Sequence, residues 1–288
     1  MLPLESVPNF SEGRDRGTID AIGDALGEHA RILDLHVDDD HNRCVFTVVG
    51  DDAALVEALV AAVAVARERI DLRRHDGAHP RIGAADVVPF VPIRPDDFGR
   101  ARAAALEVGR RVGEVGLPVF VYAPPERGPA FYRRGDVAEL QRRIDAGELE
   151  PDFGPRRLDP AAGGVIVGAR RPLVAFNVNL RGSLEVAREL AALVRERGGG
   201  FPGVRALGLD LPRAGVVQVS MNVEDWEAAA LHEIVERIAD EAAARGAEVL
   251  GSEIVGLMPA GAAAAAAGAM LRIDGFDASR VLELRLLE

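Results

Sequence analysis

The chain has 288 residues and a net charge of −12, and all 34 of its basic residues are arginine. Without lysine, the protein cannot form a pyridoxal Schiff base or use a P-loop lysine or a lysine general base, and its acidic balance argues against a nucleic-acid-binding surface. Guanidinium groups bind carboxylates but transfer protons poorly, so the six histidines are the first candidates for acid–base chemistry.

Strand-like and helix-like segments alternate along the first third of the chain. Apolar periodicity predicts a strand over residues 4–9, a helix over 15–28, strands over 31–37 and 43–50, a helix over 51–70 and a strand over 87–93. This order of β-α-β-β-α-β is that of the split βαβ, or ferredoxin-like, arrangement.

The same order recurs in the last third of the chain. Strands are predicted over residues 173–180, 204–209, 216–222 and 249–255, with helices over 183–197 and 225–245. The middle section predicts a helix over 97–115, a strand over 118–122, a short helix over 136–146 and a Pro/Gly-rich stretch over 151–164. We therefore expect an α/β (α+β) protein of two subdomains with ferredoxin-like βαββαβ elements, in which helices pack on mixed β-sheets.

One connection is much longer than its counterpart. The first unit has sixteen residues, DLRRHDGAHPRIGAAD at 71–86, between its last helix and its last strand, whereas the second unit has only a few. Long irregular connections in compact domains are usually functional or disordered. This one carries two histidines and three arginines, so we expect the functional site here.

Metal-ligand patterns are weak in this sequence. His75 and His79 are four residues apart, but Pro80 and the nearby glycines predict a shaped loop instead of a zinc-binding helix. The segment HVDDDHNR at 36–43 could assemble a metal site in space, although acid-rich turns between strands are more often solvated. We therefore expect no bound metal.

The glycine-bounded segment GGVIVGARRP at 163–172 ends in two arginines. A phosphate-binding loop needs a helix N-terminus after it, and a strand is predicted here, so neither a dinucleotide fingerprint nor a P-loop fits. The functional interpretation is a loop that brings its backbone close to a flat ligand, with Arg170 or Arg171 meeting a carboxylate.

Several features predict a cytoplasmic protein without a membrane partner. Cys44, the single cysteine, cannot form an internal disulfide, and its apolar strand pattern predicts a buried structural thiol. The first ten residues have neither a basic region nor a long apolar stretch. The most apolar stretch, residues 259–271, is shorter than the roughly 20 residues that a membrane span requires.

A series of motifs along the chain resembles the glutamate formiminotransferase family. They are VPNFSEG at 7–13, DHNR at 40–43, RHDGAHPRIGAAD at 74–86, VPF at 88–90, PDFGP at 151–155, GAR at 168–170, AFNVNL at 175–180, QVSMN at 218–222 and GSEIVGL at 251–257. The motifs keep their order and spacing over nearly the whole chain, which makes chance resemblance improbable.

The resemblance implies a transferase that moves the formimino group from N-formimino-L-glutamate to N5 of tetrahydrofolate and releases L-glutamate. Folate would lie between the two subdomains, and members of the family are typically homodimers. The family's division predicts subdomains at residues 1–177 and 178–288. The cyclodeaminase domain that some members carry is not expected at this length.

The resemblance also maps functional residues onto this sequence. The family's general base corresponds to His79. Its folate-contacting loop corresponds to Gly163, Gly164, Val165, Ile166, Val167, Gly168, Ala169, Arg170, Arg171 and Pro172. Vertebrate members carry small hydroxyl-bearing residues at the three β-branched positions of this loop and an acidic residue at His36, so the acceptor of the transfer stays open.

The implied chemistry fits these residue types. Attack of the folate amine on the amidine carbon gives a tetrahedral intermediate, which must lose a proton from the incoming nitrogen and gain one on the departing nitrogen. A histidine does both near neutral pH. Both substrates carry carboxylates, so we expect an arginine-rich substrate site. Its candidates are Arg43, Arg74, Arg81 and Arg170, with His36, His41 and His75 as weaker ones that could instead orient loops.

Two other functions stay open on the sequence alone. Paired ferredoxin-like units also serve as sensors, so the protein could bind folate or an amino acid without catalysis. It could also be a metal-dependent hydrolase that uses its histidine and aspartate cluster. In each case the expected partners are small molecules.

Overall fold

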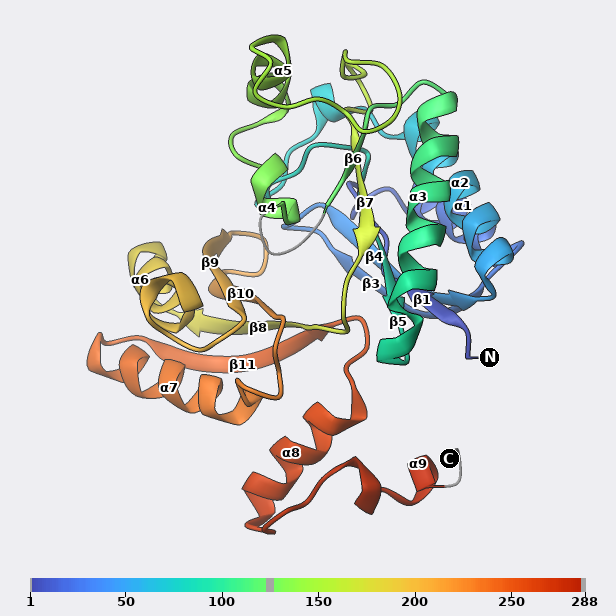
Figure 1. Ribbon diagram of the computed structural model, residues 1–288. Coiled ribbons are helices and arrows are strands. Elements are labelled where there is room, and N and C mark those ends of the chain that lie inside the picture. Colours follow the sequence, from blue (N-terminus) through green and yellow to red (C-terminus); the bar gives the residue numbers. More distant parts are fainter. Residues whose placement is uncertain (1, 123–126, 286–288) are drawn as a thin grey trace. The chain divides into compact units, whose positions relative to one another are not determined.

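The structure is a computed structural model of the chain, and it describes residues 2–122 and 127–285. The chain divides into two compact units, Met1–Arg171 and Pro172–Glu288 (Figure 1). A division at residue 177 would fall inside the strand Val174–Arg181 of the second unit.

The first unit is built on a seven-stranded sheet. Its strands are β1 (Leu4–Ser6), β2 (Asn9–Phe10), β3 (Arg31–Asp38), β4 (Arg43–Gly50), β5 (Ala85–Pro92), β6 (Val119–Val121) and β7 (Val165–Ala169). Its helices are α1 (Arg16–Gly27), α2 (Asp52–Arg69), α3 (Phe98–Glu114), α4 (Pro129–Tyr132) and α5 (Val137–Asp145). The short strands β1 and β2 both lie between β4 and β5 and pair antiparallel with them, whereas β7 runs parallel to β5 and β6.

The second unit is a four-stranded antiparallel sheet. Its strands are β8 (Val174–Arg181), β9 (Val204–Leu211), β10 (Val216–Val223) and β11 (Glu248–Val255). Its helices are α6 (Leu184–Val194), α7 (Leu231–Ala244), α8 (Ala260–Leu271) and α9 (Leu282–Arg285). Every helix within residues 2–122 and 127–285 is too short or too polar to span a lipid bilayer.

The predicted ferredoxin-like arrangement is confirmed in both units. The second sheet has the order β11-β8-β10-β9, in which the first strand lies between the third and the fourth. In the first sheet, the first strand of the unit is interrupted and forms β1 and β2. It again lies between the third strand, β4, and the fourth strand, β5, and the second strand, β3, pairs with β4. The strands β7 and β6 extend this sheet beyond β5. The two units therefore repeat one topology, as their element order predicts.

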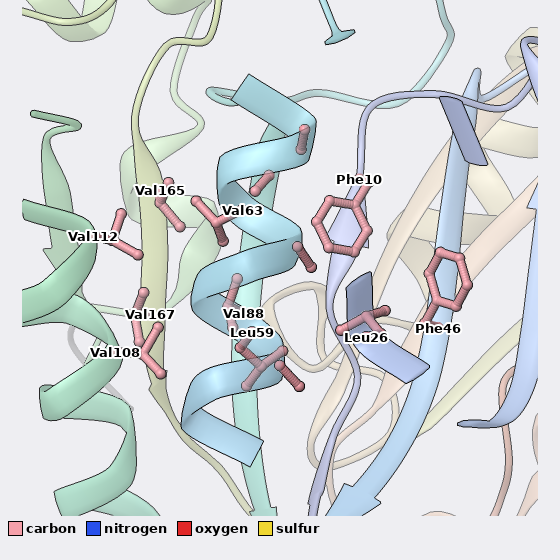
Figure 2. Packing of buried hydrophobic residues seen from close by; sticks show 14 of the residues in the cluster. Phe10, Leu26, Phe46, Leu59, Val63, Val88, Val108, Val112, Val165 and Val167 are labelled. Carbon is pink, nitrogen blue, oxygen red and sulfur yellow. The ribbon is translucent and has the colours of Figure 1, made fainter. Parts of the chain in front are cut away.

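The main core of the first unit lies between the sheet and α1, α2 and α3. Figure 2 shows side chains of these helices meeting side chains of the strands. The labelled residues are Leu26, Leu59, Val63, Val108 and Val112 from helices and Phe10, Phe46, Val88, Val165 and Val167 from strands. Cys44 belongs to this core and is 0% exposed, which confirms the prediction of a buried thiol.

A second cluster lies on the other side of β5, β6 and β7, where α4 and α5 supply its helical side chains. Tyr132 of α4 and Leu140 and Ile144 of α5 join Phe120 and Ile166 of the strands. Strand side chains alternate between the two clusters, since successive residues of a strand point to opposite faces. This second side of the sheet also holds the candidate site.

Two predicted elements differ in the structure. Residues 165–169 were expected within a loop, but they form β7, because a Val-Ile-Val run favours a strand buried on both faces. The helix predicted from residue 225 begins at Leu231. Asp225 instead accepts the N–H of Ala228 at 3.1 Å and caps a separate turn that does not continue into the helix.

Candidate active site

The loop at residues 71–86 joins α2 to β5 and is fixed at both ends by backbone hydrogen bonds. Leu72, near its start, donates its N–H to the carbonyl of Ala161 at 2.8 Å. Ala84, near its end, donates to Ala162 at 2.9 Å. A long connection thus becomes a defined structure because the segment before β7 anchors it.

Glycines allow this anchoring because the two backbones pass very close together. A Cβ on Gly83 would lie 1.9 Å from the carbonyl oxygen of Gly164, and one on Gly163 would lie 2.0 Å from the oxygen of Ile82. Gly163 also has a φ of +69°, in the left-handed region that favours glycine. The glycines of the two motifs therefore serve one shared contact.

Asn42, in the turn between β3 and β4, holds a second side of the loop. Its side chain accepts the N–H of Gly13 at 2.9 Å and donates to the carbonyl of Asp76 at 2.9 Å. Its φ of 46° is left-handed, which asparagine tolerates better than most residues. Ala78 adds a backbone bond to the carbonyl of Asp40 at 3.0 Å. The turn and the loop therefore form one unit.

Arg81 ties the same turn to the loop through its guanidinium. It donates to the carbonyl oxygens of His41 at 2.9 Å, Asn42 at 3.2 Å and His79 at 2.7 Å. Its Nη1 also lies 2.6 Å from Nε2 of His75. Burial lowers the pKa of Arg81 to about 10, so it stays charged at pH 7. These contacts support a positioning role for Arg81, and direct binding of substrate by it stays a prediction.

The ring of His79 is oriented by the backbone of the next residue. Its Nδ1 lies 2.8 Å from the carbonyl oxygen of Pro80. A carbonyl oxygen can only accept a hydrogen bond, so Nδ1 carries the proton and the lone pair of the neutral ring is on Nε2. Nε2 is therefore the nitrogen that can take a proton from a substrate.

The surroundings of His79 keep its imidazole neutral. Burial is the largest cause that lowers its pKa well below the ordinary 6.5, and the positive charges of Arg43 and Arg133 lower it further. His41, whose ring centroid is 5.8 Å away, acts in the same direction, whereas the bond to Pro80 raises the pKa. At pH 7 the ring is a neutral base beside fixed cations.

Two residues that sequence reasoning missed complete these electrostatics. Arg133, directly after α4, forms an ion pair with Asp86. Asp86 is 3% exposed, and its other oxygen accepts the N–H of Ile82 at 2.7 Å. Asp86 thus links the charge of Arg133 to the loop that carries His79. Asp86 closes a motif of the sequence, but nothing in the sequence pattern connects it with Arg133, 47 residues away.

The other residues that the sequence predicts for the site differ in how close they lie to His79. Arg43, the first residue of β4, has its Nη2 3.4 Å from Nδ1 of His41. Burial, followed by the charge of Arg133, lowers the pKa of Arg43 to about 10. His36 lies opposite Val45 in the pairing of β3 and β4. Arg74 is exposed in a short turn at Leu72–Arg74. The structure thus brings His41, Arg43, His75 and Arg81 to His79.

The predicted folate-contacting segment is mostly a buried strand. Val165 and Val167 pack into the core under α2 and α3, and Ile166 packs into the cluster on the other face. Arg170, after the strand, donates its backbone N–H to Phe90 at 3.0 Å, and Arg171 is exposed. The apolar side chains of this segment thus pack inside the first unit. Contact of the segment with folate stays a prediction, and the residues at its two ends are best placed to make such a contact.

Comparison with known proteins finds two family descriptions that together cover most of the chain. The Formiminotransferase domain, N-terminal subdomain matches residues 3–170, and the Formiminotransferase domain matches residues 175–276. A glutamate formimidoyltransferase of Streptococcus pyogenes serotype M1 is 38% identical over 294 residues, which cover 99% of this chain and 98% of that protein. One from Thermoplasma acidophilum is also 38% identical, over 98% and 97%.

Bifunctional relatives match along part of their length. The formimidoyltransferase-cyclodeaminase of Rattus norvegicus is 37% identical over 270 residues, which cover 89% of this chain and 50% of that protein. The similarity to the shorter relatives therefore extends over nearly the full length of both chains, while the longer relative contains about as much sequence again.

Proposed function

The chain belongs to the formiminotransferase domain family, and on that premise we propose that it transfers the formimino group of N-formimino-L-glutamate to N5 of tetrahydrofolate, with His79 moving the protons. The products are 5-formimidoyltetrahydrofolate and L-glutamate. The reaction belongs to histidine degradation and one-carbon metabolism. The observation that carries the role of His79 is its hydrogen bond to Pro80, which leaves Nε2 as the base.

In this mechanism His79 acts first as a base and then as an acid. N5 of tetrahydrofolate forms a bond to the amidine carbon, and Nε2 takes the proton that N5 loses. The same proton then goes to the glutamate nitrogen as its bond to carbon breaks, and L-glutamate leaves. The imidazolium that forms in between lies near Arg43 and Arg133, whose charges make it a stronger acid. The lowered pKa therefore keeps Nε2 unprotonated and free to take a proton, and it favours the return of that proton to the departing nitrogen.

The arginines supply the positive charge that two anionic substrates require. Arg43 and Arg133 lie in the centre of the site, where burial strengthens their attraction for a carboxylate. Arg74 and Arg170 remain candidates for contacts farther out. Arg81, with its donors on backbone carbonyls, preserves the shape of the loop.

The proposal includes a homodimer in the cytoplasm that works without a bound metal. Its support is the resemblance to the family and a chemistry that needs proton transfer alone. Light scattering of the purified protein tests the dimer, and elemental analysis tests the metal. A stoichiometric metal whose removal abolishes transfer would favour a metal-dependent reaction instead.

The direct test is to mix the purified protein with N-formimino-L-glutamate and tetrahydrofolate and to follow the release of L-glutamate. We expect release that depends on both substrates. Folate binding without release at high enzyme concentration would replace the transferase by a folate-binding protein of the same family. Absence of both binding and release would remove the folate assignment.

A further inference from the structure

Two arginines of the candidate site keep donors that no described residue uses. Arg43 of β4 and Arg133 after α4 each have an Nε without a hydrogen-bond partner among the residues that the structure describes. Arg133 uses Nη2 in its ion pair with Asp86, and Arg43 places its Nη2 3.4 Å from Nδ1 of His41. A guanidinium carries five N–H donors in a fork that matches a carboxylate, so both side chains can still bind an anion.

These arginines also lie within reach of one another's charge. Burial is the largest cause that lowers the pKa of Arg43, the charges of Arg133 and Arg81 lower it as well, and Asp38 and Asp86 offset part of this effect. Arg81 uses its donors on three backbone carbonyl oxygens of the site. An anion at Arg43 and Arg133 would therefore relieve the repulsion between like charges and satisfy the unused donors.

The base of the proposed reaction lies in the same cluster. After burial, the charges of Arg43 and Arg133 are the two largest causes that lower the pKa of His79. Both guanidinium groups are thus close enough to the imidazole for their charge to act on it. All three residues belong to the first unit, so the cluster needs no residue of the second. An anion that these arginines hold would lie beside the base.

The chemistry of the two substrates identifies this anion. In N-formimino-L-glutamate the α-carboxylate is attached to the same carbon as the departing nitrogen, whereas the γ-carboxylate lies at the far end of the side chain. In tetrahydrofolate the carboxylates lie beyond the aminobenzoyl group, far from N5. With the amidine within reach of Nε2 of His79, the α-carboxylate is therefore the anionic group nearest to the base.

We propose that Arg43 and Arg133 bind the α-carboxylate of N-formimino-L-glutamate and hold it until L-glutamate leaves. This inference rests on the proposed function, since that compound is the donor there. It assigns the two arginines to one substrate and to one of its carboxylates. Because the α-carbon carries both the carboxylate and the departing nitrogen, this contact also keeps that nitrogen near His79 while it receives its proton.

The test compares two donors that each lack one negative charge. N-formimino-L-glutamine keeps the α-carboxylate and has an amide in place of the γ-carboxylate, and N-formimino-L-isoglutamine has the reverse arrangement. Release of the free amino acid in the presence of tetrahydrofolate gives kcat/KM for each donor. We expect the isoglutamine donor to have a kcat/KM about 10–100-fold lower, because it loses the charge-assisted hydrogen bonds to both arginines.

Arg43→Met and Arg133→Met should each bring the ratio of the two kcat/KM values close to one. The ratio is the informative quantity, because an effect of either substitution on His79 changes both donors alike. Arg31→Met is the matched control, since Arg31 is an exposed arginine of the neighbouring strand β3, and it should keep the full ratio. The KM for tetrahydrofolate should stay within about twofold in all three variants, since the proposed contact is to the formimino donor.

A binding measurement gives the same comparison without turnover. N-formyl-L-glutamine and N-formyl-L-isoglutamine carry an amide in place of the amidine, and calorimetry measures the affinity of the unmodified protein for each. We expect the glutamine compound, which keeps the α-carboxylate, to bind about tenfold or more tightly.

The outcomes separate this inference from the proposed function. Equal or reversed preference between the two donors in the unmodified protein overturns the inference, and this result needs no variant to fold. A full ratio that persists in both arginine variants overturns it as well, because the α-carboxylate then binds elsewhere. Transfer in either case leaves the proposed function standing. Tighter binding of N-formyl-L-glutamine without transfer from any donor would support the inference and reject the function.

Discussion

Nδ1 of His79 lies 2.8 Å from the carbonyl oxygen of Pro80, the next residue in the chain. The hydrogen-bond acceptor that fixes the tautomer of His79 is thus a backbone carbonyl oxygen instead of a carboxylate side chain. The orientation of the ring then depends on the conformation of the loop at residues 71–86. The residues that hold this loop, Arg81 and Asn42, accordingly act on the ring of His79 through the backbone.

Replacing His79 tests its role most directly. We expect His79→Ala to lower kcat by about 10²–10⁴-fold, the usual contribution of a general acid–base group. Binding of 5-formyltetrahydrofolate should change little, because the cationic residues remain. His29→Ala, which alters an exposed histidine just after α1, should leave kcat unchanged. An equal loss of folate affinity in His79→Ala would indicate a binding role instead.

The pH profile tests the cations around the base. The pKa of His79 lies below 6.5, so kcat/KM should hold at pH 6.5 and fall only at lower pH, as Nε2 becomes protonated. Arg133→Met removes a positive charge that lowers this pKa, so the acidic limb should move to higher pH. Arg134→Met, at the adjacent exposed residue, should leave the limb in place. A profile of Arg133→Met that coincides with the unmodified one would remove Arg133 from the electrostatics of the site.

Gly83 tests the contact between the loop and the segment before β7. Gly83→Ala would place a Cβ 1.9 Å from the carbonyl oxygen of Gly164. We expect the free energy of unfolding to fall by about 1–3 kcal/mol and kcat to fall with it. Gly99→Ala is the control, since no described atom lies within 4 Å of its Cβ, and alanine favours the helix α3 by up to about 1 kcal/mol. Urea unfolding of both variants gives the comparison, and a neutral Gly83→Ala would show that the backbones can separate freely.

Asn42 separates hydrogen bonding from backbone conformation. Asn42→Gly keeps the left-handed φ of 46° but removes the bonds to Gly13 and Asp76, so we expect a loss of about 1–3 kcal/mol. Asn42→Ala should cost about 1 kcal/mol more, because alanine is strained there. Thermal unfolding measures the difference. Equal stability of the two variants would mean that the turn relaxes to an ordinary φ.

The sequence predicted the architecture well because its signals are local. Apolar alternation places β4 at residues 43–50 as the structure has it, and Ser183 caps α6 as expected, accepting the N–H of Val186 at 3.3 Å. The repeated β-α-β-β-α-β order follows from such elements alone. β7 was missed because the glycines before it and the arginines after it dominate the pattern, while its burial depends on β5 and β6, which lie far away in sequence.

The candidate site was predictable only in part. Its position in the loop at residues 71–86 followed from the length of the connection and from its histidines. The ion pair of Arg133 with Asp86 arises from the end of a helix and a strand that meet after folding. Periodicity identifies which face of a strand is polar, but it does not tell which residues from other strands share that face.

Cys44 gives the protein a chemical probe of its own. It follows Arg43 in β4, it is the single cysteine of the chain, and burial raises the pKa of its thiol to about 12. A thiol reagent reacts with an accessible thiolate, so labelling must wait until β4 opens to solvent. The labelling rate of the unmodified protein therefore reports the opening of the strand that carries Arg43, and a ligand that closes the site would slow it.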